Sequence, residues 1–305
     1  MAVVYGSARK SYLQMLDTVH NQGLRIALGA FKTSPVQSLY VEANEPSLYT
    51  RREKLSLQYA LRVAANTSNP AHKIVFKPKY LDSYNKKTKQ IKPLGLRIQS
   101  FTEETSFDEN NVKEISTPDT PPWTITSPNV IFDLKSITKK SETSPEIFLS
   151  KYHEIKSKYK DHYAIYTDGS KNNSKVGCAA VSNLHRSKLR LPDSASIFTA
   201  ETKAIDLALN FITNSNERKF IVFSDSLSVL QSIHNRNFEN PLIQNILLKV
   251  HTLSLKKTVV FCWIPSHIGI KGNEDADTAA KQSLSLSQSK MKLPYTDYKP
   301  TVSAK

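Results

Sequence analysis

The sequence has little cysteine, little glycine and no long hydrophobic run. Two cysteines among 305 residues exclude a disulfide framework or a zinc cage built from cysteine, so we expect a reducing, intracellular setting, in the nucleus or the cytoplasm. Eight glycines and fifteen prolines exclude a collagen-like or low-complexity chain. No run approaches the ~18 apolar residues of a membrane span, and the first residues lack the apolar stretch of a secretory signal. We therefore expect a protein that is neither secreted nor bound to a membrane.

The chain does contain enough apolar residues for a core and a large excess of positive charge. Hydrophobic residues make up 39% of the sequence, and the formal net charge is +15. Residues 1–160 carry a net charge of +9, residues 161–280 carry only +2, and residues 281–305 carry +4. A basic chain favours a polyanionic partner such as nucleic acid, although solubility alone is an equally good reason for the excess. The nearly neutral middle block raises the question of where its acidic residues lie.

The hydrophobic pattern divides the chain into four parts. Residues 1–78 form a small helical segment, with amphipathic helices expected at 10–30 and 47–66. Residues 79–145 are rich in Asn, Lys, Thr, Ser, Glu and Pro, which predicts a largely irregular linker. Residues 146–285 carry regular elements, and residues 286–305 form a basic tail.

The third part alternates between strand and helix patterns. Strands are expected at 162–167, 176–182, 187–191, 219–223 and 258–263. Helices are expected at 146–160, 198–212, 227–233, 241–253 and 273–284. This order predicts an α/β domain with a five-stranded mixed sheet flanked by helices.

Four acidic residues stand at the ends of these strands and near the starts of these helices. Asp168 and Asp225 follow the first and fourth strands. If these strands are neighbours in the sheet, the two carboxylates lie side by side at one edge. Glu201 and Asp277 lie early on two helices and can converge on the same point.

Four carboxylates at one point cannot all stay ionised unaided, and a hard divalent cation removes the conflict. Oxygen ligands suit Mg²⁺ or Mn²⁺, and two such ions support an in-line phosphoryl displacement by water. Each acid also has an ordinary explanation: a turn at Asp168, a helix cap at Asp225, and dipole compensation at Glu201 and Asp277. Their order on this element pattern favours the metal site.

The same residues form motifs that resemble a type 1 ribonuclease H domain over about 161–285. The motifs are YTDGSK (166–171), TAE (199–201), FSDS (223–226) and WIPSHIGIKGNEDADTAAK (263–281). The last is the most specific, because His267 stands in a glycine-bearing loop ten residues before Asp277. The resemblance implies a ribonuclease H-like fold and hydrolysis of the RNA strand of RNA–DNA hybrids. It also implies two Mg²⁺ ions held by Asp168, Glu201, Asp225 and Asp277.

The resemblance assigns roles to further residues. His267 would assist proton transfer or product release, and Glu274 would modulate the metal site. Candidate contacts to the RNA 2′-hydroxyls are Gly169, Ser170, Thr199 and Asn273. Turn or cap chemistry explains these small polar residues equally well.

The chain departs from the family in one respect and resembles a second family elsewhere. Some ribonucleases H carry a basic helix and loop between the positions of Asp225 and His267, and this chain has no lysine-rich protrusion there. Residues 23–63, PLGLRI (93–98) and PPWTI (121–125) resemble the pol proteins of Jockey-type non-LTR retrotransposons, just past the polymerase core. By this resemblance the chain is the C-terminal portion of such a protein, and the polymerase core is a candidate partner. Polymerase activity is not expected, because no Asp-Asp pair occurs in the chain.

Three functions remain open from the sequence. The first is a metal-dependent hybrid ribonuclease, which all four acids and His267 favour. The second is a non-catalytic nucleic-acid-binding remnant of a mobile element, which the basic 1–160 segment favours. The third is a DNA nuclease or integrase of the same broad fold, which the SHIGIKGNEDAD arrangement at 266–277 disfavours.

Overall fold

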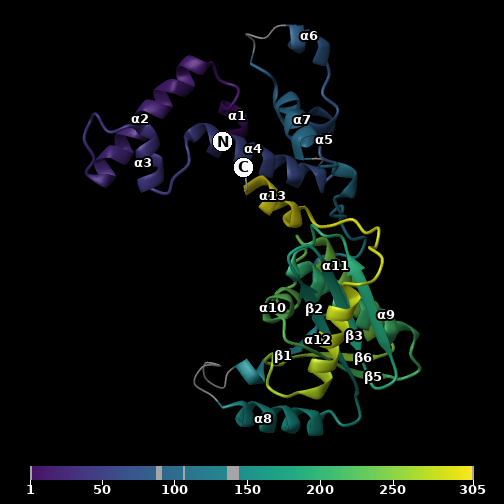
Figure 1. Ribbon diagram of the computed structural model, residues 1–305. Helices are drawn as coiled ribbons and strands as arrows, with labels where there is room; N and C mark the ends of the chain where they lie inside the picture. Colours follow the sequence, from purple (N-terminus) through teal and green to yellow (C-terminus); the bar gives the residue numbers. More distant parts are fainter. Residues whose placement is uncertain (1, 87–90, 106, 136–143, 304–305) are drawn as a thin grey trace. The chain divides into compact units, whose positions relative to one another are not determined.

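The computed structural model describes residues 2–86, 91–105, 107–135 and 144–303, which form two compact units (Figure 1). The first unit comprises Met1–Glu114 and Tyr298–Lys305, and the second comprises Ile115–Asp297. Parts of the predicted linker, at 87–90, 106 and 136–143, and the last two residues of the predicted tail lie outside the described residues.

A six-stranded mixed sheet forms the centre of the second unit, in the order β1-β6-β5-β2-β3-β4. The strands are β1 (Asn129–Ile131), β2 (Tyr163–Lys171), β3 (Val176–Val181), β4 (Arg186–Leu191), β5 (Lys219–Ser224) and β6 (Thr258–Trp263). Strands β1, β6, β5 and β2 pair in parallel, whereas β2, β3 and β4 form an antiparallel meander. Parallel neighbours require crossover connections. The chain returns from the meander to β5, beside β2, through a helix after β4, and helices also connect β5 to β6.

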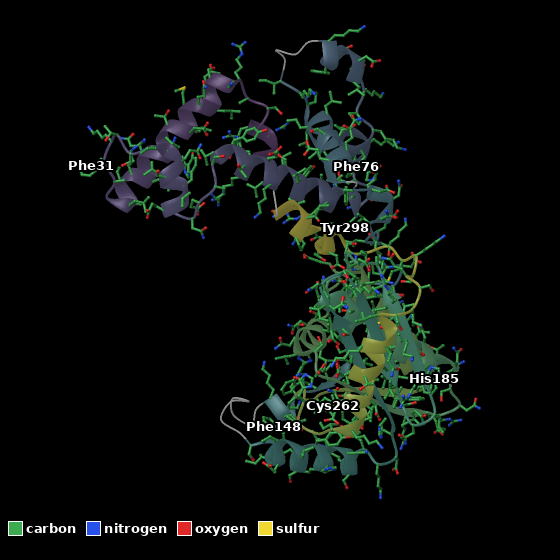
Figure 2. The ribbon with its side chains drawn as sticks, viewed as in Figure 1. Phe31, Phe76, Phe148, His185, Cys262 and Tyr298 are labelled. Carbon is green, nitrogen blue, oxygen red and sulfur yellow. The ribbon has the colours of Figure 1, made fainter. Side chains whose placement is uncertain are left out.

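Five helices flank this sheet. They are α8 (Pro145–Lys158), α9 (Ile197–Asn214), α10 (Leu227–His234), α11 (Pro241–Ser254) and α12 (Lys271–Ser283). Successive side chains of a strand point to opposite faces, so the sheet has a core on each side. In β5, Phe220 and Val222 pack with α9, α10 and α11, while Ile221 and Phe223 pack with α8 and α12. Figure 2 labels Phe148 of α8 and Cys262 of β6, which both belong to the second of these cores.

The predicted α/β architecture with a mixed sheet is confirmed, and the sheet has six strands rather than five. The additional strand, β1, pairs in parallel with β6 through Val130 opposite Phe261. Val130 and Phe132 pack against the core under α9–α11, and Leu134 is buried in the other core. A strand of three residues inside a polar stretch has too short a pattern to be recognised from its sequence.

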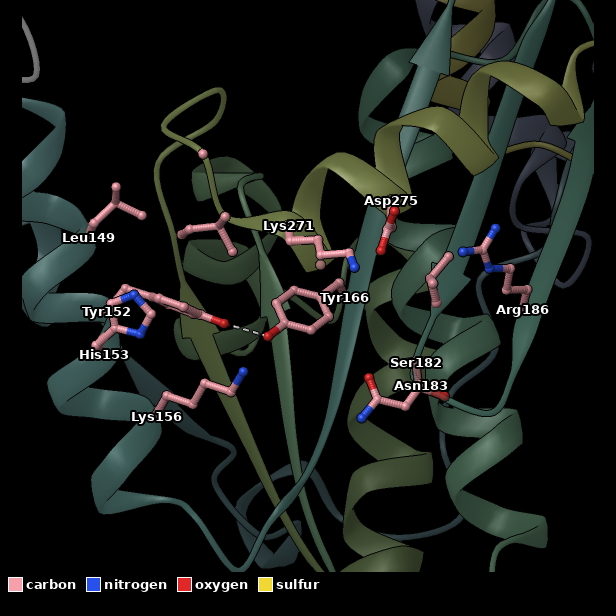
Figure 3. Close-up of a pocket in the computed structure, with 14 residues that line it drawn as sticks. Leu149, Tyr152, His153, Lys156, Tyr166, Ser182, Asn183, Arg186, Lys271 and Asp275 are labelled. Atoms are coloured by element: carbon pink, nitrogen blue, oxygen red, sulfur yellow. Dashed lines mark hydrogen bonds between the residues drawn. The ribbon is translucent and has the colours of Figure 1, made fainter.

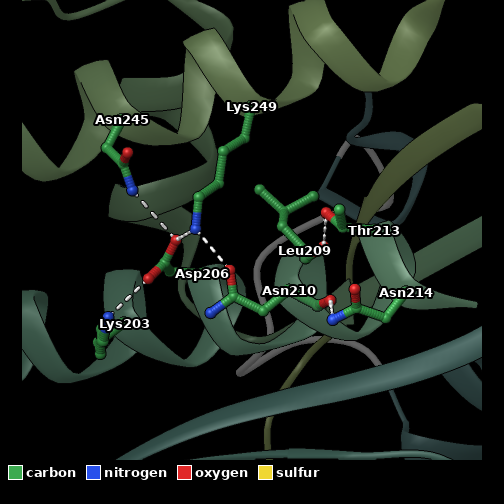
Figure 4. A network of polar contacts seen from close by, with 8 residues as sticks. All are labelled: Lys203, Asp206, Leu209, Asn210, Thr213, Asn214, Asn245 and Lys249. Carbon is green, nitrogen blue, oxygen red and sulfur yellow. Dashed lines mark hydrogen bonds and ion pairs between the residues drawn. The ribbon is translucent and has the colours of Figure 1, made fainter.

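A buried charge network joins α9 to α11 in the second unit (Figure 4). The carboxylate of Asp206 binds Nζ of Lys203 at 2.6 Å, Nδ2 of Asn245 at 3.1 Å and Nζ of Lys249. Burial alone would raise the pKa of Asp206, but the hydrogen bonds from Lys203 and Lys249 hold it below its ordinary value. The network therefore fixes the packing of α11 on α9 through a carboxylate that stays ionised.

Replacing Asp206 by asparagine is expected to lower the free energy of unfolding by about 1–2 kcal/mol at pH 7. Because the folded-state pKa is depressed, this stabilisation is present above the unfolded-state pKa of about 4 and is lost as the pH falls through the folded-state value. Urea unfolding at pH 7 and pH 3 tests this, with the exposed Asp161→Asn as the matched control. A stability gap of the same size at both pH values would contradict a role of the charge.

The first unit is helical. Its α-helices are α1 (Ala2–Tyr5), α2 (Lys10–Leu28), α3 (Val36–Glu42), α4 (Leu48–Ala64), α5 (Ala71–Phe76), α6 (Leu81–Lys86), α7 (Leu94–Thr105) and α13 (Lys299–Ser303). Leu57 and Leu61 of α4 are buried together with residues of α5 and α7, whereas α2 buries none of its residues. Phe31, labelled in Figure 2, is 82% exposed just beyond the end of α2. The helices expected at 10–30 and 47–66 correspond to α2 and α4.

Two predicted segments contain more structure than their composition suggests. The predicted linker at 79–145 includes the twelve-residue helix α7, with Leu96 and Ile98 buried, and three single-turn 3-10 helices. These are η1 (Glu109–Asn111), η2 (Pro122–Thr124) and η3 (Asp133–Lys135). In the predicted tail at 286–305, Leu293 is buried and the 3-10 helix η4 (Tyr295–Tyr298) holds the buried Asp297. Isolated apolar residues in a polar segment give no periodic signal, which is why the sequence indicated irregular chain here.

Candidate active site

The parallel pairing of β2 with β5 brings two of the predicted acids together. The register pairs Thr167 with Ser224, so the next residues, Asp168 and Asp225, lie side by side at the same end of the two strands. The third acid, Glu201, comes from α9, which packs on β2. Ligand oxygens of Asp168, Glu201 and Asp225 all lie within 4.8 Å of one another. Three of the four predicted carboxylates therefore form one cluster.

Local sequence explains how α9 approaches β2 so closely. A Cβ atom at Gly169 would lie 2.7 Å from the backbone nitrogen of Glu201, so only glycine permits this contact. Ser196 caps the helix, because its Oγ accepts a hydrogen bond from the Thr199 N–H at 3.1 Å. The carboxylate of Asp297 in turn accepts from Ser196 Oγ at 2.8 Å. The start of α9, and with it the position of Glu201, is therefore fixed from both sides.

The three clustered carboxyl groups have raised pKa values. Burial and the neighbouring Asp225 and Asp277 raise the pKa of Asp168 to about 7. Burial and the charge of Asp168 raise the pKa of Glu201 well above its ordinary value, and burial also raises the pKa of Asp225. Buried like charges are unfavourable without a cation, so the cluster favours either protons or a metal ion between its members.

The donor set of the cluster fits a hard divalent cation. Oε2 of Glu201 is buried and has no hydrogen-bond partner. Within the described part of the chain, no lysine or arginine forms an ion pair with Asp168, Glu201 or Asp225. Carboxylate oxygens are the ligands that Mg²⁺ and Mn²⁺ prefer, and a cation would satisfy the unpartnered oxygen as well as the negative charge.

The fourth predicted acid, Asp277, lies on α12 beside the cluster and has a partner of its own. Its Oδ2 binds Nζ of Lys281 at 2.7 Å, and its side chain is 25% exposed. Its charge contributes to the raised pKa values of Asp168 and Asp225, which places it close to both. It is not one of the three residues whose ligand atoms lie within 4.8 Å of one another.

The predicted loop histidine is exposed next to this cluster. His267 lies between β6 and α12 and has a positive φ of 57°, which is uncommon for a residue with a side chain. The buried Ile264, Ile268 and Ile270 anchor the loop on either side of it. The charge of His267 acts to lower the pKa of Asp225, so the two side chains are electrostatic neighbours. Glu274 is exposed in the first turn of α12.

The residues proposed to contact substrate fall into two groups. Gly169 and Ser170 are half-buried on β2 directly after Asp168. Thr199 is completely buried, and its Oγ1 accepts a hydrogen bond from Ser196 Oγ at 3.2 Å. Asn273 is 4% exposed and its Nδ2 donates to Oδ2 of Asp225 at 3.4 Å. In this structure Thr199 supports the cap of α9, and Asn273 orients a carboxylate.

The structure adds one supporting residue, Trp263, to which the sequence analysis gave no role. Nε1 of Trp263 donates a hydrogen bond to the backbone oxygen of Asp225 at 3.1 Å. Trp263 is the last residue of β6, the neighbour of β5, and is opposite Ser224 in the register. Its position at the end of a predicted strand was the available signal, but the sequence alone does not show whether a tryptophan there packs in the core or donates a hydrogen bond.

Comparison with known proteins identifies the segment that carries this site. Residues 160–285 match the family model of RNase H. The Pol polyprotein of equine infectious anemia virus (strain Wyoming) is 32% identical over 124 residues, which cover 38% of this chain and 10% of the polyprotein. The Pol polyprotein of isolate 1369 is 33% identical over 124 residues, again with 38% and 10% coverage. The chain thus spans about 10% of the length of the curated relatives it matches.

Proposed function

Because residues 160–285 form an RNase H domain, we propose that this chain is a metal-dependent endonuclease that hydrolyses the RNA strand of RNA–DNA hybrids. One observation supports the proposal most strongly. Asp168, Glu201 and Asp225 come from three different parts of the fold, yet their carboxylates, two of them buried and that of Asp225 half-buried, converge within 4.8 Å. Packing alone gives no reason to gather unpaired buried acids, because each costs free energy without a cation.

The cluster would hold Mg²⁺ or Mn²⁺ through Asp168, Glu201 and Asp225, with Asp277 as a further ligand after it leaves Lys281. Divalent cations at such a site activate water and neutralise charge on the phosphate in an in-line displacement. We propose two ions, because four carboxylates are more than a single Mg²⁺ ordinarily binds beside substrate phosphate.

The other residues of the site would position these groups and move protons. Asn273 and Trp263 hold Asp225 at its side chain and its backbone, so its carboxylate is oriented before substrate arrives. His267 is exposed beside Asp225 and would transfer a proton or assist product release. Gly169 and Ser170 would contact RNA next to Asp168, and Glu274 would modulate the site from the first turn of α12.

We propose further that the chain derives from the pol protein of a Jockey-like retrotransposon. The motifs at 23–63, 93–98 and 121–125 support this origin, and the matched relatives are Pol polyproteins. The predicted domain order, with a helical segment, a connecting segment, the RNase H domain and a basic end, fits a piece that lies beyond a polymerase core. That core would be the partner of the first unit.

None of the described helices is long and apolar enough to span a bilayer.

The proposed activity predicts cleavage of the RNA strand of an RNA–DNA hybrid and of no other duplex. The full chain is incubated with end-labelled RNA–DNA hybrid, duplex DNA and duplex RNA, each with Mg²⁺, Mn²⁺ or EDTA. Cleavage of the hybrid's RNA strand only, leaving 5′-phosphate and 3′-hydroxyl ends and abolished by EDTA, is the expected result. Tight hybrid binding without cleavage in either metal would instead support a non-catalytic binding remnant, whose basis is the net charge of +9 on residues 1–160.

A further inference from the structure

A second feature of the unit that contains the sheet is a polar pocket of about 500 Å³ on the α8 and α12 side of the sheet (Figure 3). Its walls are α8, the turn between β3 and β4, and the start of α12. The hydroxyl groups of Tyr152 and Tyr166 meet inside it at 2.5 Å. The volume lies in the range of small-ligand pockets and exceeds that of one phosphate group.

The pocket is lined mainly by hydrogen-bond donors. Lys156 of α8, Arg186 of β4 and Lys271 of α12 contribute three positive charges, and Asp275 is the one acid among the lining residues. Figure 3 shows Lys156 and Lys271 extending from two different helices toward the tyrosine pair. In the described part of the chain, no carboxylate forms an ion pair with any of these three cations. The balance of charge favours an anionic ligand.

The tyrosine pair adds a neutral donor. Only one hydroxyl hydrogen lies between the two oxygens, so the other is free to bind an acceptor in the pocket. A Cβ atom at Gly272 would lie 2.3 Å from the Tyr166 ring, so glycine lets the start of α12 close over this ring. The start of α12 lines the pocket, and no side chain caps its first N–H groups, which are further donors for an anion.

The pocket and the carboxylate cluster share two elements. Tyr166 precedes Asp168 by two residues on the same face of β2, a separation of about 7 Å. Lys271 precedes Asp277 by six residues on α12, a separation of about 9 Å. The rise of about 3.4 Å per base step is measured along the helix axis, and consecutive phosphates of one strand lie farther apart than this rise, so these separations correspond to one or two nucleotides. A phosphate in the pocket can therefore belong to the same strand as a phosphate at the cluster.

We propose that this pocket binds a backbone phosphate of the RNA strand, one or two nucleotides from the bond that the carboxylate cluster hydrolyses. The inference rests on the proposed function, whose substrate supplies the phosphate. The segment between Asp225 and His267 carries no lysine-rich protrusion that could bind the hybrid. The pocket would supply contacts with the hybrid in its place. The cations of α8, β4 and α12 replace counterions of the strand, and the phenol donates to a phosphate oxygen.

The test measures hybrid binding separately from cleavage. Lys156→Glu and Arg186→Glu are made in the Asp225→Asn background, so that bound hybrid is not consumed. Lys158→Glu is the matched control, because Lys158 is an exposed lysine of the same helix that does not line the pocket. Fluorescence anisotropy with labelled hybrid at several salt concentrations gives the affinity and its salt dependence, and circular dichroism checks that each variant is folded.

Each pocket variant is expected to weaken hybrid binding roughly tenfold more than Lys158→Glu does. The slope of log affinity against log salt should fall by about one more unit than in the control, as expected for the loss of one phosphate contact. Affinities and slopes equal to those of the control would overturn the pocket, even if the unmodified chain cleaves hybrids. Loss of binding in the variants of a chain that cleaves nothing would uphold the phosphate site and reject the proposed function.

A competition experiment identifies the source of the phosphate. Inorganic phosphate and a 5′-mononucleotide are added at constant ionic strength to the chain with and without bound hybrid. If the pocket binds a strand phosphate, inorganic phosphate and the mononucleotide should compete only weakly, and the hybrid should bind much more tightly than either. If the mononucleotide binds as tightly as the hybrid does, and loses its binding in Lys156→Glu while the hybrid does not, the pocket serves a small ligand and the proposal is wrong.

Discussion

Replacing Asp225 by asparagine is expected to lower the rate of RNA-strand cleavage roughly a thousandfold. The substitution keeps the shape of the side chain and leaves an oxygen that can still accept the hydrogen bond from Asn273. What it removes is one negative charge from the cluster with Asp168 and Glu201, and with it the affinity for a divalent cation. Single-turnover cleavage of a labelled hybrid in saturating Mg²⁺ measures the rate.

The binding of hybrid separates a chemical defect from a folding defect. Asp225→Asn should bind the hybrid with little change, because the loss affects the reaction and not the contacts with the strand. The exposed Asp161→Asn makes the same chemical change at the surface and should keep the full rate. An Asp225→Asn protein that cleaves within tenfold of the unmodified chain would contradict the assignment of this carboxylate to the metal site.

Replacing Asp168 by asparagine is expected to abolish activity and yet to stabilise the metal-free protein. Burial and the neighbouring Asp225 raise the pKa of Asp168 to about 7, above the unfolded-state value of about 4. Between pH 4 and pH 7 the folded protein therefore holds a proton that the unfolded chain releases, so its stability falls as the pH rises through this window. Above pH 7 the buried carboxylate of Asp168 is ionised and its full cost in folding free energy is present. Asparagine carries no charge and therefore removes roughly 2–4 kcal/mol of this cost.

Thermal unfolding with EDTA at a series of pH values tests this prediction. The melting temperature of Asp168→Asn should equal that of the unmodified chain near pH 4 and exceed it by several degrees at pH 8. Mg²⁺ at pH 8 should raise the melting temperature of the unmodified chain and leave the variant unchanged. Asp161→Asn should follow the unmodified chain throughout. A variant less stable than the unmodified chain at pH 8 without metal would indicate that Asp168 is held by favourable contacts.

Much of the fold follows from local patterns in the sequence. The unbroken apolar run from Phe220 to Phe223 in β5 predicts a strand buried on both faces, and the RNase H-like fold class is confirmed. Periodicity also located both ends of α9 and α12 within two residues. The short strand β1 and the burial of Leu293 were not predicted, because a few apolar residues in a polar segment show no periodicity.

Some features of the candidate site could likewise be predicted from the sequence, and others could not. The convergence of Asp168 and Asp225 was predictable only on the condition that their strands are neighbours in the sheet, and the parallel pairing of β2 with β5 meets this condition. The placement of Glu201 further depended on Gly169, which permits close packing of α9. The hydrogen bonds of Asn273 and Trp263 to Asp225 were not predictable, because they depend on side-chain directions set by packing. The roles of His267, Glu274 and Asp277 remain proposals.

Mn²⁺ provides the strictest test of whether Asp168, Glu201 and Asp225 form a divalent-cation site. Crystals of the full chain soaked in Mn²⁺ would be measured at a wavelength at which manganese scatters anomalously. We predict a strong anomalous peak at about 2.0–2.2 Å from carboxylate oxygens of all three residues, at the cluster in which Glu201 Oε2 lacks a partner. Ordered carboxylates with no such peak at saturating Mn²⁺ would contradict the account.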